Sequence, residues 1–179
     1  MTMNLGLVSV RYARALLKAS IEAKQSEQVY NDMTAVAENY VKLPRLRTAV
    51  DNPMLSKQQK EELLVAAAAG TTCQLTKTFI ALVLKEGRES IMQFIANSFI
   101  SLYRKENNLV SAKLTTATAL NPATEARLRQ LVESKTNGKV EFKAETEPDI
   151  IGGFVLEYDT YRMDASVRTQ LNAILSKLI

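Results

Sequence analysis

Ile151-Gly152-Gly153-Phe154-Val155-Leu156 and, after a short gap, Met163-Asp164-Ala165-Ser166-Val167-Arg168 decide the fold of the C-terminal part of the chain. The glycine pair predicts a bend, because glycine adopts positive φ without steric strain. Alternation along residues 154–158 predicts a strand with one buried face. Asp164 or Ser166 then caps a helix. The expected order is a glycine bend, a strand, a hairpin and a capped final helix.

Two more strands and a helix are expected just before this stretch. Residues 110–114 and 140–144 alternate between apolar and polar side chains, as half-buried strands do. Asn121-Pro122 predicts a helix start between them, because proline suits the first helical position. The inner face of that helix would consist of Leu128, Leu131 and Val132. Asp159-Thr160 is expected to turn the hairpin. The apolar stripe of the final helix consists of Val167, Leu171, Ile174, Leu175 and Leu178.

Helical spacing dominates from Ser9 to about Asn107. The polar tripeptide Glu106-Asn107-Asn108 fits a linker. We therefore expect a two-domain α+β protein, with an all-α domain at residues 1–107 and a small α/β domain at residues 108–179. The helices of the first domain are expected at about 8–23, 26–43, 44–50, 57–69, 74–86 and 89–106.

Local signals support these helix ends. Asn52-Pro53 stops a helix, because the residue before proline avoids helical dihedrals. Ser56-Lys57-Gln58-Gln59 has the spacing of a capping box and starts the next helix. Gly70 and Gly87 stand where a helix C-terminus favours a residue that tolerates positive φ.

Composition argues against catalysis. The 179 residues are 46% hydrophobic and 23% charged, which is typical of a globular protein with a real core. With no Trp and 6% aromatic residues, that core should be aliphatic. His is absent, and with it the usual general base and metal ligand. The single thiol, Cys73, is expected to be a small apolar residue at a helix start.

Other catalytic or nucleotide-binding patterns are weak. Gly152-Gly153 does not open a helix, so it lacks the context of a phosphate-binding loop, and no Walker-type sequence occurs. Glu61 and Glu62 are adjacent and point to different faces of their helix. We expect no catalytic residues, cofactor, metal or nucleotide site. An enzyme with a carboxylate site stays open as an alternative, and would need a perturbed acidic pair in a pocket.

The charge leaves a binding alternative open. The formal net charge is +4 and the isoelectric point is about 9.2. Residues 1–106 carry 14 Lys and Arg against 10 Asp and Glu, so the excess lies there. This excess positive charge could bind an acidic partner helix or nucleic acid, although the basic residues do not form the continuous blocks that are typical of nucleic-acid-binding proteins. A nucleic-acid-binding or other helical adaptor module is therefore kept as a second hypothesis.

Membrane insertion is not expected. The longest apolar run, Phe79-Ile80-Ala81-Leu82-Val83-Leu84, is far shorter than the ~20 residues that cross a bilayer. The opening residues 1–7 lack the charged start and apolar stretch of a secretory signal, so the chain should remain in the cytoplasm.

The first helix has a wide apolar surface. Its polar stripe consists of Arg11, Arg14, Lys18 and Glu22. One apolar face consists of Val10, Ala13, Leu17 and Ile21. The adjacent face consists of Tyr12, Ala15, Leu16, Ala19 and Ala23. Together these faces span roughly 240°, against the ~100° that one-sided packing needs. Either the helix is buried centrally in its own bundle, or the face around Ala15 and Ala19 receives a partner's amphipathic helix.

The fifth helix raises the same question. Residues 79–84 are apolar in every direction, so this helix must be covered on all sides. A domain of about 100 residues has little surface with which to do so. It is either the central helix of the bundle or a helix that a partner completes.

Several motifs together resemble the delta subunit of F-type ATP synthases, the family of the oligomycin-sensitivity-conferring protein. They span almost the whole chain, and the last is the most specific. The motifs are Arg11-Tyr12-Ala13-Arg14-Ala15-Leu16, Asn52-Pro53, the segment from Phe79 to Arg88 that ends in Lys85-Glu86-Gly87-Arg88, Gly152-Gly153-Phe154-Val155 and Asp164-Ala165-Ser166-Val167-Arg168. The chain departs from the family at Ala165, where Gly is common, and at Asp159-Thr160, where a Gly-Asp type turn is common.

The resemblance implies a fold and a role. It implies an N-terminal six-helix bundle that holds the N-terminal helix of an alpha subunit, and a C-terminal α/β domain that grips b-type stalk subunits. The protein would be a non-catalytic stator subunit at the cytoplasmic face of the bacterial inner membrane. The expected head-binding residues are Tyr12, Ala15, Ala19, Leu75, Phe79 and Leu82. The motif that would define the C-terminal fold consists of Gly152, Gly153, Asp164, Ser166 and Arg168.

Overall fold

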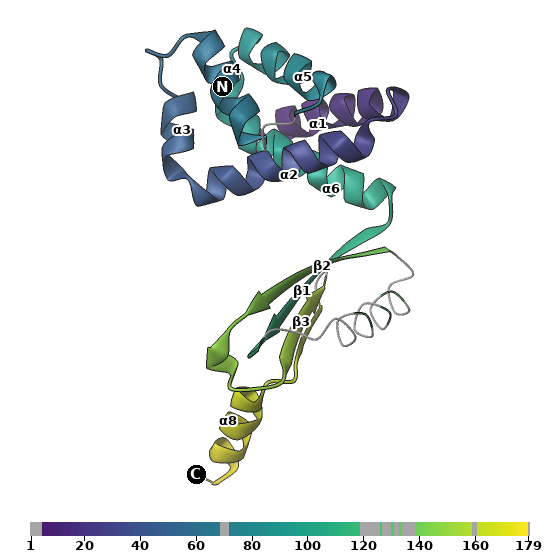
Figure 1. The fold of residues 1–179 in the computed structure, drawn as a ribbon, viewed down its shortest axis with the longest axis vertical. Helices are drawn as coiled ribbons and strands as arrows, with labels where there is room; N and C mark the ends of the chain where they lie inside the picture. The colour runs from purple at the N-terminus through teal and green to yellow at the C-terminus, as the bar shows by residue number, and fades with distance from the viewer. Residues whose placement is uncertain are drawn as a thin grey trace. The chain divides into compact units, whose positions relative to one another are not determined.

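The structure of the chain is a computed structural model that describes residues 5–68, 72–118, 126, 130, 133, 139–158 and 161–178. It divides into two compact units, Met1–Lys105 and Glu106–Ile179. The first unit is helical and the second contains a mixed sheet, as Figure 1 shows. The expected succession of a helical part and a small α/β part is thereby confirmed.

The described elements of the first unit follow the expected helices closely. Its elements are α1 (Leu5–Glu22), α2 (Ser26–Lys42), α3 (Pro44–Val50), α4 (Lys57–Ala67), α5 (Gln74–Lys85), the 3-10 turn η1 (Glu89–Ile91) and α6 (Met92–Glu106). Two differences stand out. The first helix starts three residues earlier than expected, and the helix expected from residue 89 opens with a 3-10 turn. Gly70 lies outside the described residues.

Local hydrogen bonds explain the helix ends. The side chain of Ser56 accepts from the Gln59 amide at 3.2 Å, and the Gln59 side chain accepts from the Ser56 amide at 3.0 Å, which is the expected capping box. Gly87 ends α5 at φ 63°, as predicted. Lys24 ends α1 in the same left-handed conformation at φ 55°. This second cap was missed, because lysine carries no signal for positive φ.

The core of the first unit is less purely aliphatic than the composition suggested. Its fully buried side chains include Phe99, Met33 and Met92 beside Leu64 and Ile80.

A polar contact inside the first unit joins α2 to the start of α5. The buried Asp32 of α2 accepts from the backbone amide of Cys73 at 3.1 Å, so a distant carboxylate caps α5. Cys73 lies at the helix start, where it was expected.

A buried ion pair joins α4 to η1. Lys60 Nζ lies 2.9 Å from Glu89 Oε1, and the two side chains are only 6% and 22% exposed. Burial alone would raise the pKa of Glu89, but the hydrogen bond from Lys60 and the nearby lysine charges outweigh it and lower that pKa. The buried Tyr40 hydroxyl and Glu89 Oε2 have no hydrogen-bond partner among the described residues. The pair therefore links α4 to η1 through two largely buried charges.

We expect Glu89→Gln to lower the free energy of unfolding by about 2 kcal/mol, because it leaves the Lys60 ammonium buried without a carboxylate. Urea denaturation of the full chain measures this. The matched control is Glu38→Gln, which removes an exposed pair with Lys42 and should cost less than about 0.5 kcal/mol. Equal losses in the two variants would contradict the assignment.

The same pair makes a prediction about pH. Because the folded pKa of Glu89 lies below its unfolded value, its contribution is complete above the unfolded pKa near 4.5 and is lost as the pH falls through the lower folded value. Glu89→Gln should therefore flatten the acid side of the stability profile. Stability curves measured between about pH 3 and 6 compare the two chains.

The second unit is built on a four-stranded mixed sheet in the order β2-β1-β3-β4. Its elements are β1 (Leu109–Thr116), β2 (Lys139–Thr146), the turn η2 (Pro148–Ile150), β3 (Phe154–Tyr158), β4 (Tyr161–Asp164) and α8 (Val167–Leu178). β1 pairs in parallel with β2 and antiparallel with β3, and β4 adds antiparallel to β3. Residues 121, 122, 128, 131, 132, 159 and 160, for which a helix and a turn were expected, lie outside the described residues.

One face of this sheet forms the core of the second unit. The core consists of Ala112, Leu114, Val140 and Leu156. The alternation expected for β1 and β3 holds only in part. Ala112, Leu114 and Leu156 are buried as expected. Thr115 and Val155, which are cross-strand partners on the opposite face, are buried as well, so the expectation of a single buried face was wrong there. In β2 the alternation holds for Val140, but Ala144 is exposed, so the expectation of a buried face along the whole strand was wrong at that end. β2 is an edge strand, and its last residues have neighbours on one side only.

The glycine pair bends the chain where β3 meets the start of α8. Gly153 has φ 75°, and a Cβ there would lie 2.2 Å from the carbonyl oxygen of Ala165. A Cβ on Gly152 would lie 3.1 Å from the side chain of Val167. Two backbone hydrogen bonds fix this approach, from Ala165 N to Phe154 O at 2.9 Å and from Val167 N to Gly152 O at 3.0 Å. The glycines are required by close packing as well as by φ.

Ser166 caps α8, which decides between the two expected candidates. Its hydroxyl accepts from the Thr169 amide at 3.2 Å. Asp164 supports the cap by accepting from the Ser166 amide at 3.0 Å and from the Thr169 hydroxyl at 3.0 Å. The hydrogen bonds from Ser166 lower the pKa of Asp164. Arg168 is exposed in the first turn of α8, and Ala165 is not among the residues with positive φ, so no glycine is needed there.

Candidate partner-binding groove

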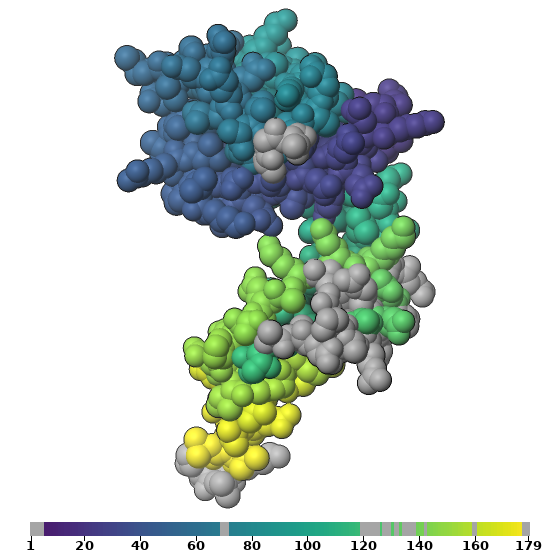
Figure 2. Space-filling model, viewed as in Figure 1, coloured from purple at the N-terminus to yellow at the C-terminus, as the bar shows by residue number. Residues whose placement is uncertain are grey.

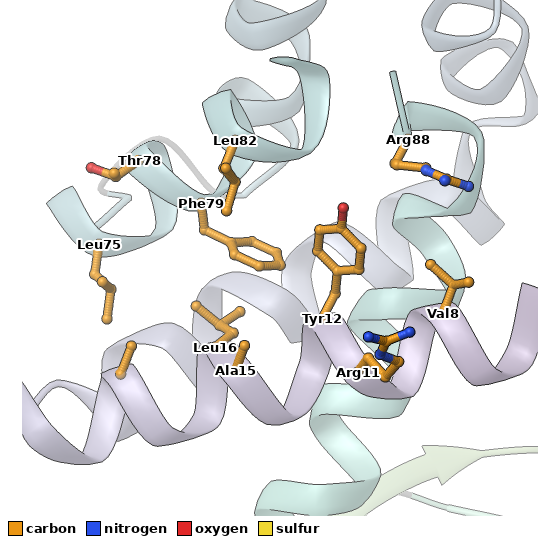
Figure 3. A pocket seen from close by; sticks show the side chains of 11 residues that line it. Val8, Arg11, Tyr12, Ala15, Leu16, Leu75, Thr78, Phe79, Leu82 and Arg88 are labelled. Carbon is orange, nitrogen blue, oxygen red and sulfur yellow. The ribbon is translucent and has the colours of Figure 1, made fainter. Parts of the chain in front are cut away.

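An open groove of about 700 Å³ lies between α1 and α5 in the first unit. Figure 3 shows the side chains that α1 and α5 direct toward one another across it. The groove is lined by Val8, Arg11, Tyr12, Ala15, Leu16, Ala19, Leu75, Thr78, Phe79, Leu82 and Arg88. None of these eleven side chains is acidic, and most are apolar.

Buried side chains form the floor of the groove and small or exposed ones form its walls. Leu16 and Phe79 are 2% and 7% exposed. The rings of Tyr12 and Phe79 meet edge to face with their centroids 6.4 Å apart. Ala15 is exposed on α1, and Leu82 is 47% exposed on α5. An apolar surface of this shape has room for another helix.

The six residues expected to bind a partner all line this groove. Helix periodicity placed Tyr12, Ala15 and Ala19 on one face, and the structure brings the α5 residues Leu75, Phe79 and Leu82 opposite them. The list of expected binding residues omitted Val8, Arg11, Leu16, Thr78 and Arg88. Val8 could have been found one turn before Tyr12. Arg11 had been assigned to the solvated stripe, and Arg88 lies beyond the end of α5.

The structure decides how the wide apolar surface of α1 is covered. Ala13 and Leu16 are buried in the unit, whereas Ala15 is exposed. Ile21 shares an apolar face with the buried Ala13, but it is 49% exposed in the last turn of α1. α5 is not enclosed either, because Leu82 remains open. Complete burial of both helices in their own bundle is therefore wrong.

The second unit carries an unpartnered apolar surface on α8. We call it the α8 stripe, and it consists of Leu171, Ile174 and Leu175, which are 51%, 56% and 59% exposed. The sequence left open whether this stripe is core or contact surface. Figure 2 shows α8, in yellow, as part of the outer surface of its unit. Leu171, Ile174 and Leu175 are therefore not part of a core.

Two kinds of feature are absent from the described residues. Among the described residues, no group of three or more His, Cys, Asp or Glu side chains is placed to hold a metal ion. In the same residues no helix is both long and apolar enough to cross a bilayer. A polar cleft of about 350 Å³ on the second unit is lined in part by residues that already pair, such as Arg162 with Glu157 at 3.1 Å.

Comparison with known proteins gives one consistent result. The family described as ATP synthase delta (OSCP) subunit matches residues 8–178. A protein of Phocaeicola vulgatus named ATP synthase subunit delta is 40% identical over 99% of this chain and 96% of its own length. A protein of the same name from Parabacteroides distasonis is 39% identical over 99% of this chain and 98% of its own.

A solved structure shares the fold. A chain of the Toxoplasma gondii mitochondrial ATP synthase hexamer aligns with 95% of this chain and 96% of its own, with a TM-score of 0.65. Its sequence identity is 24%, so it supports the fold alone.

Proposed function

The chain belongs to the ATP synthase delta (OSCP) subunit family, and from this premise we propose that it connects the catalytic head of an F-type ATP synthase to the peripheral stalk. It is a non-catalytic stator subunit. We further propose that it lies peripherally at the cytoplasmic face of the bacterial inner membrane; the relatives named above come from bacteria.

The groove between α1 and α5 is the proposed site for the head. Its occupant would be the N-terminal helix of an alpha subunit, with α1 to α6 acting as the six-helix bundle that the family resemblance implied. The observation that carries this proposal is the open apolar groove, with its small side chains Ala15 and Ala19. Small residues let a second helix approach closely, and apolar walls suit the buried face of an amphipathic helix.

The α8 stripe is the proposed contact with b-type stalk subunits. These three exposed aliphatic side chains lie at positions i, i+3 and i+4 of one helix, which is the spacing of an apolar seam between helices. Each of the two units would thus hold one end of the connection.

The physical task of such a connection is to resist torque without slipping. This requires slow dissociation, which apolar burial supplies. At about 25 cal/mol per Å², about 400 Å² of buried apolar surface contributes about 10 kcal/mol before the costs of association. No reacting group is needed for this task.

Titration of the full chain tests the assignment. We would add a synthetic peptide of the alpha-subunit N-terminus, and separately a C-terminal segment of the b-type subunit, and follow backbone amide shifts by NMR. The first should perturb groove residues such as Tyr12 and Phe79, and the second should perturb Leu171 and Ile174. An RNA oligonucleotide should perturb neither set at moderate salt. Absence of peptide binding, or salt-sensitive RNA binding in its place, would refute the stator assignment.

A further inference from the structure

The polar cleft of the second unit lies on the face of the sheet that is turned away from the core. Its floor consists of three buried residues from β1, β3 and η2, namely Thr115, Val155 and Ile150. Thr115 and Val155 are cross-strand partners, and their neighbours Leu114 and Leu156 belong to the core on the other face. The cleft therefore has a closed floor although its walls are charged.

Most charged side chains in the walls of the polar cleft are compensated within the second unit. Arg162 lies 3.1 Å from Glu157 and 3.8 Å from Asp164, and all three line the cleft. Lys113 lies 2.9 Å from Glu145, which is outside the cleft. These side chains hold one another and leave the recognition of a ligand to the remaining polar groups.

Two polar groups of the cleft make no such contact. The guanidinium of Arg168, exposed in the first turn of α8, has no hydrogen bond or ion pair with any residue that the structure describes. The hydroxyl of Thr115 has no partner in the same part of the chain, although Thr115 is only 8% exposed. Burying a hydroxyl without a hydrogen bond is costly, so such a group usually has a partner. Both groups can donate hydrogen bonds, and a carboxylate accepts from both.

Arg168 also continues the α8 stripe. Arg168, Leu171 and Leu175 lie at positions i, i+3 and i+7 of α8, which places them along one side of the helix. Arg168 precedes Leu171 by three residues, or about 4.5 Å of helix rise. A partner helix that covers the α8 stripe and extends past Leu171 therefore reaches Arg168 and the polar cleft.

We propose that the stalk subunit that covers the α8 stripe inserts an Asp or Glu side chain into the polar cleft, where the carboxylate accepts hydrogen bonds from Arg168 and Thr115. This inference rests on the proposed function and adds a recognition site to it. A guanidinium binds a carboxylate through two parallel hydrogen bonds, which is geometrically more specific than a simple charge contact. Glu147 also lines the cleft and repels a carboxylate placed next to it, so the acidic group is accepted only beside Arg168. An apolar stripe alone lets a helix slide along it, whereas this contact fixes the register.

Charge reversal in the full chain tests the role of Arg168. We would compare Arg168→Glu with the matched control Lys139→Glu, which makes the same charge change at an exposed residue outside the cleft. The probe is a synthetic C-terminal segment of the b-type subunit, titrated calorimetrically. We expect its affinity to fall at least about tenfold for Arg168→Glu and less than about twofold for Lys139→Glu. Arg168→Glu should still fold, because an acidic residue in the first turn of a helix is favourable. Arg168→Lys should restore only part of the affinity, since an ammonium group cannot form two parallel bonds.

A pair of threonines separates binding from folding. Thr115→Val removes a hydroxyl that has no partner in the described chain, so the urea midpoint should stay or rise while the affinity for the stalk segment falls about three- to tenfold. Thr116→Val is the matched control, because the Thr116 hydroxyl donates to the Thr118 carbonyl at 2.8 Å and does not line the cleft. It should lower the midpoint and leave the affinity within about twofold.

The outcomes distinguish the cleft from the stator role. Unchanged affinity in Arg168→Glu or in Thr115→Val would overturn the cleft assignment. Leu171→Asp, which disrupts the α8 stripe, should abolish binding of the stalk segment whether or not the cleft takes part. If the wild-type chain does not bind the stalk segment at all, the proposed function itself fails.

Discussion

Gly153→Ala is expected to destabilise the second unit by more than about 4 kcal/mol. The new Cβ would lie 2.2 Å from the Ala165 carbonyl oxygen, a backbone atom that cannot turn away as a side chain could. Moving that carbonyl would break the hydrogen bond from Ala165 N to Phe154 O. The positive φ of Gly153 adds about 1 kcal/mol of strain.

Hydrogen exchange followed by mass spectrometry measures the effect in each unit separately. Peptides covering β3 and β4 should lose protection, and those covering α2 and α6 should keep it. Gly87→Ala is the matched control, because Gly87 also has positive φ but a Cβ there meets no atom within 4 Å. It should cost only about 1 kcal/mol in the first unit. Unchanged protection of β3 in Gly153→Ala would contradict this prediction, because it would show that the backbone around Gly153 and Ala165 can rearrange with little loss of stability.

Ala15→Asp is expected to weaken binding of the alpha N-terminal peptide by more than about 2 kcal/mol, roughly thirtyfold in Kd. The substitution places a charge and added bulk in an apolar groove, where a docked helix would bury the carboxylate without a partner. Folding should be almost unaffected, because Ala15 is exposed in the free chain. Isothermal titration of the peptide into both proteins measures the difference.

A second alanine provides the control. Ala66 is exposed on α4 and does not line the groove, so Ala66→Asp makes the same chemical change elsewhere on the same unit. It should leave the peptide affinity within about twofold. Equal affinities of wild type and Ala15→Asp would rule out the groove as the binding site. An unfolded Ala15→Asp chain would contradict the exposed position of this residue.

The parts of the fold that depend on neighbouring residues could be predicted from the sequence. The Ser56 and Gln59 capping box and the left-handed Gly87 are local, and both appear as expected. The order of the strands could not be predicted, because β1 pairs with a strand that follows it by more than twenty residues and with another that runs the opposite way. Such pairings depend on distant contacts that periodicity does not report.

The candidate groove could also be predicted only in part from the sequence. Helical periodicity places Ala15 and Ala19 on the same face of α1, and this face forms one wall of the groove. Periodicity cannot tell which part of a wide apolar surface the helix's own domain covers. Ala13 and Ile21 share one apolar face of α1, yet Ala13 is buried and Ile21 is exposed. Arg88 could not be assigned to the site, because it is placed by the end of α5 and not by a helical repeat. Arg11 was missed because a charged residue on a polar stripe is ordinarily solvated.

The exposed α8 stripe has a consequence for cells that make this subunit in excess. A free copy presents Leu171, Ile174 and Leu175 to water, and in the proposed function a stalk subunit would cover them. In two free copies the α8 stripes can cover each other. Surplus chains should therefore self-associate at high concentration, and adding the stalk subunit should separate these assemblies. Cells would then have to make this subunit and the stalk subunit in balanced amounts to keep the free subunit available for assembly.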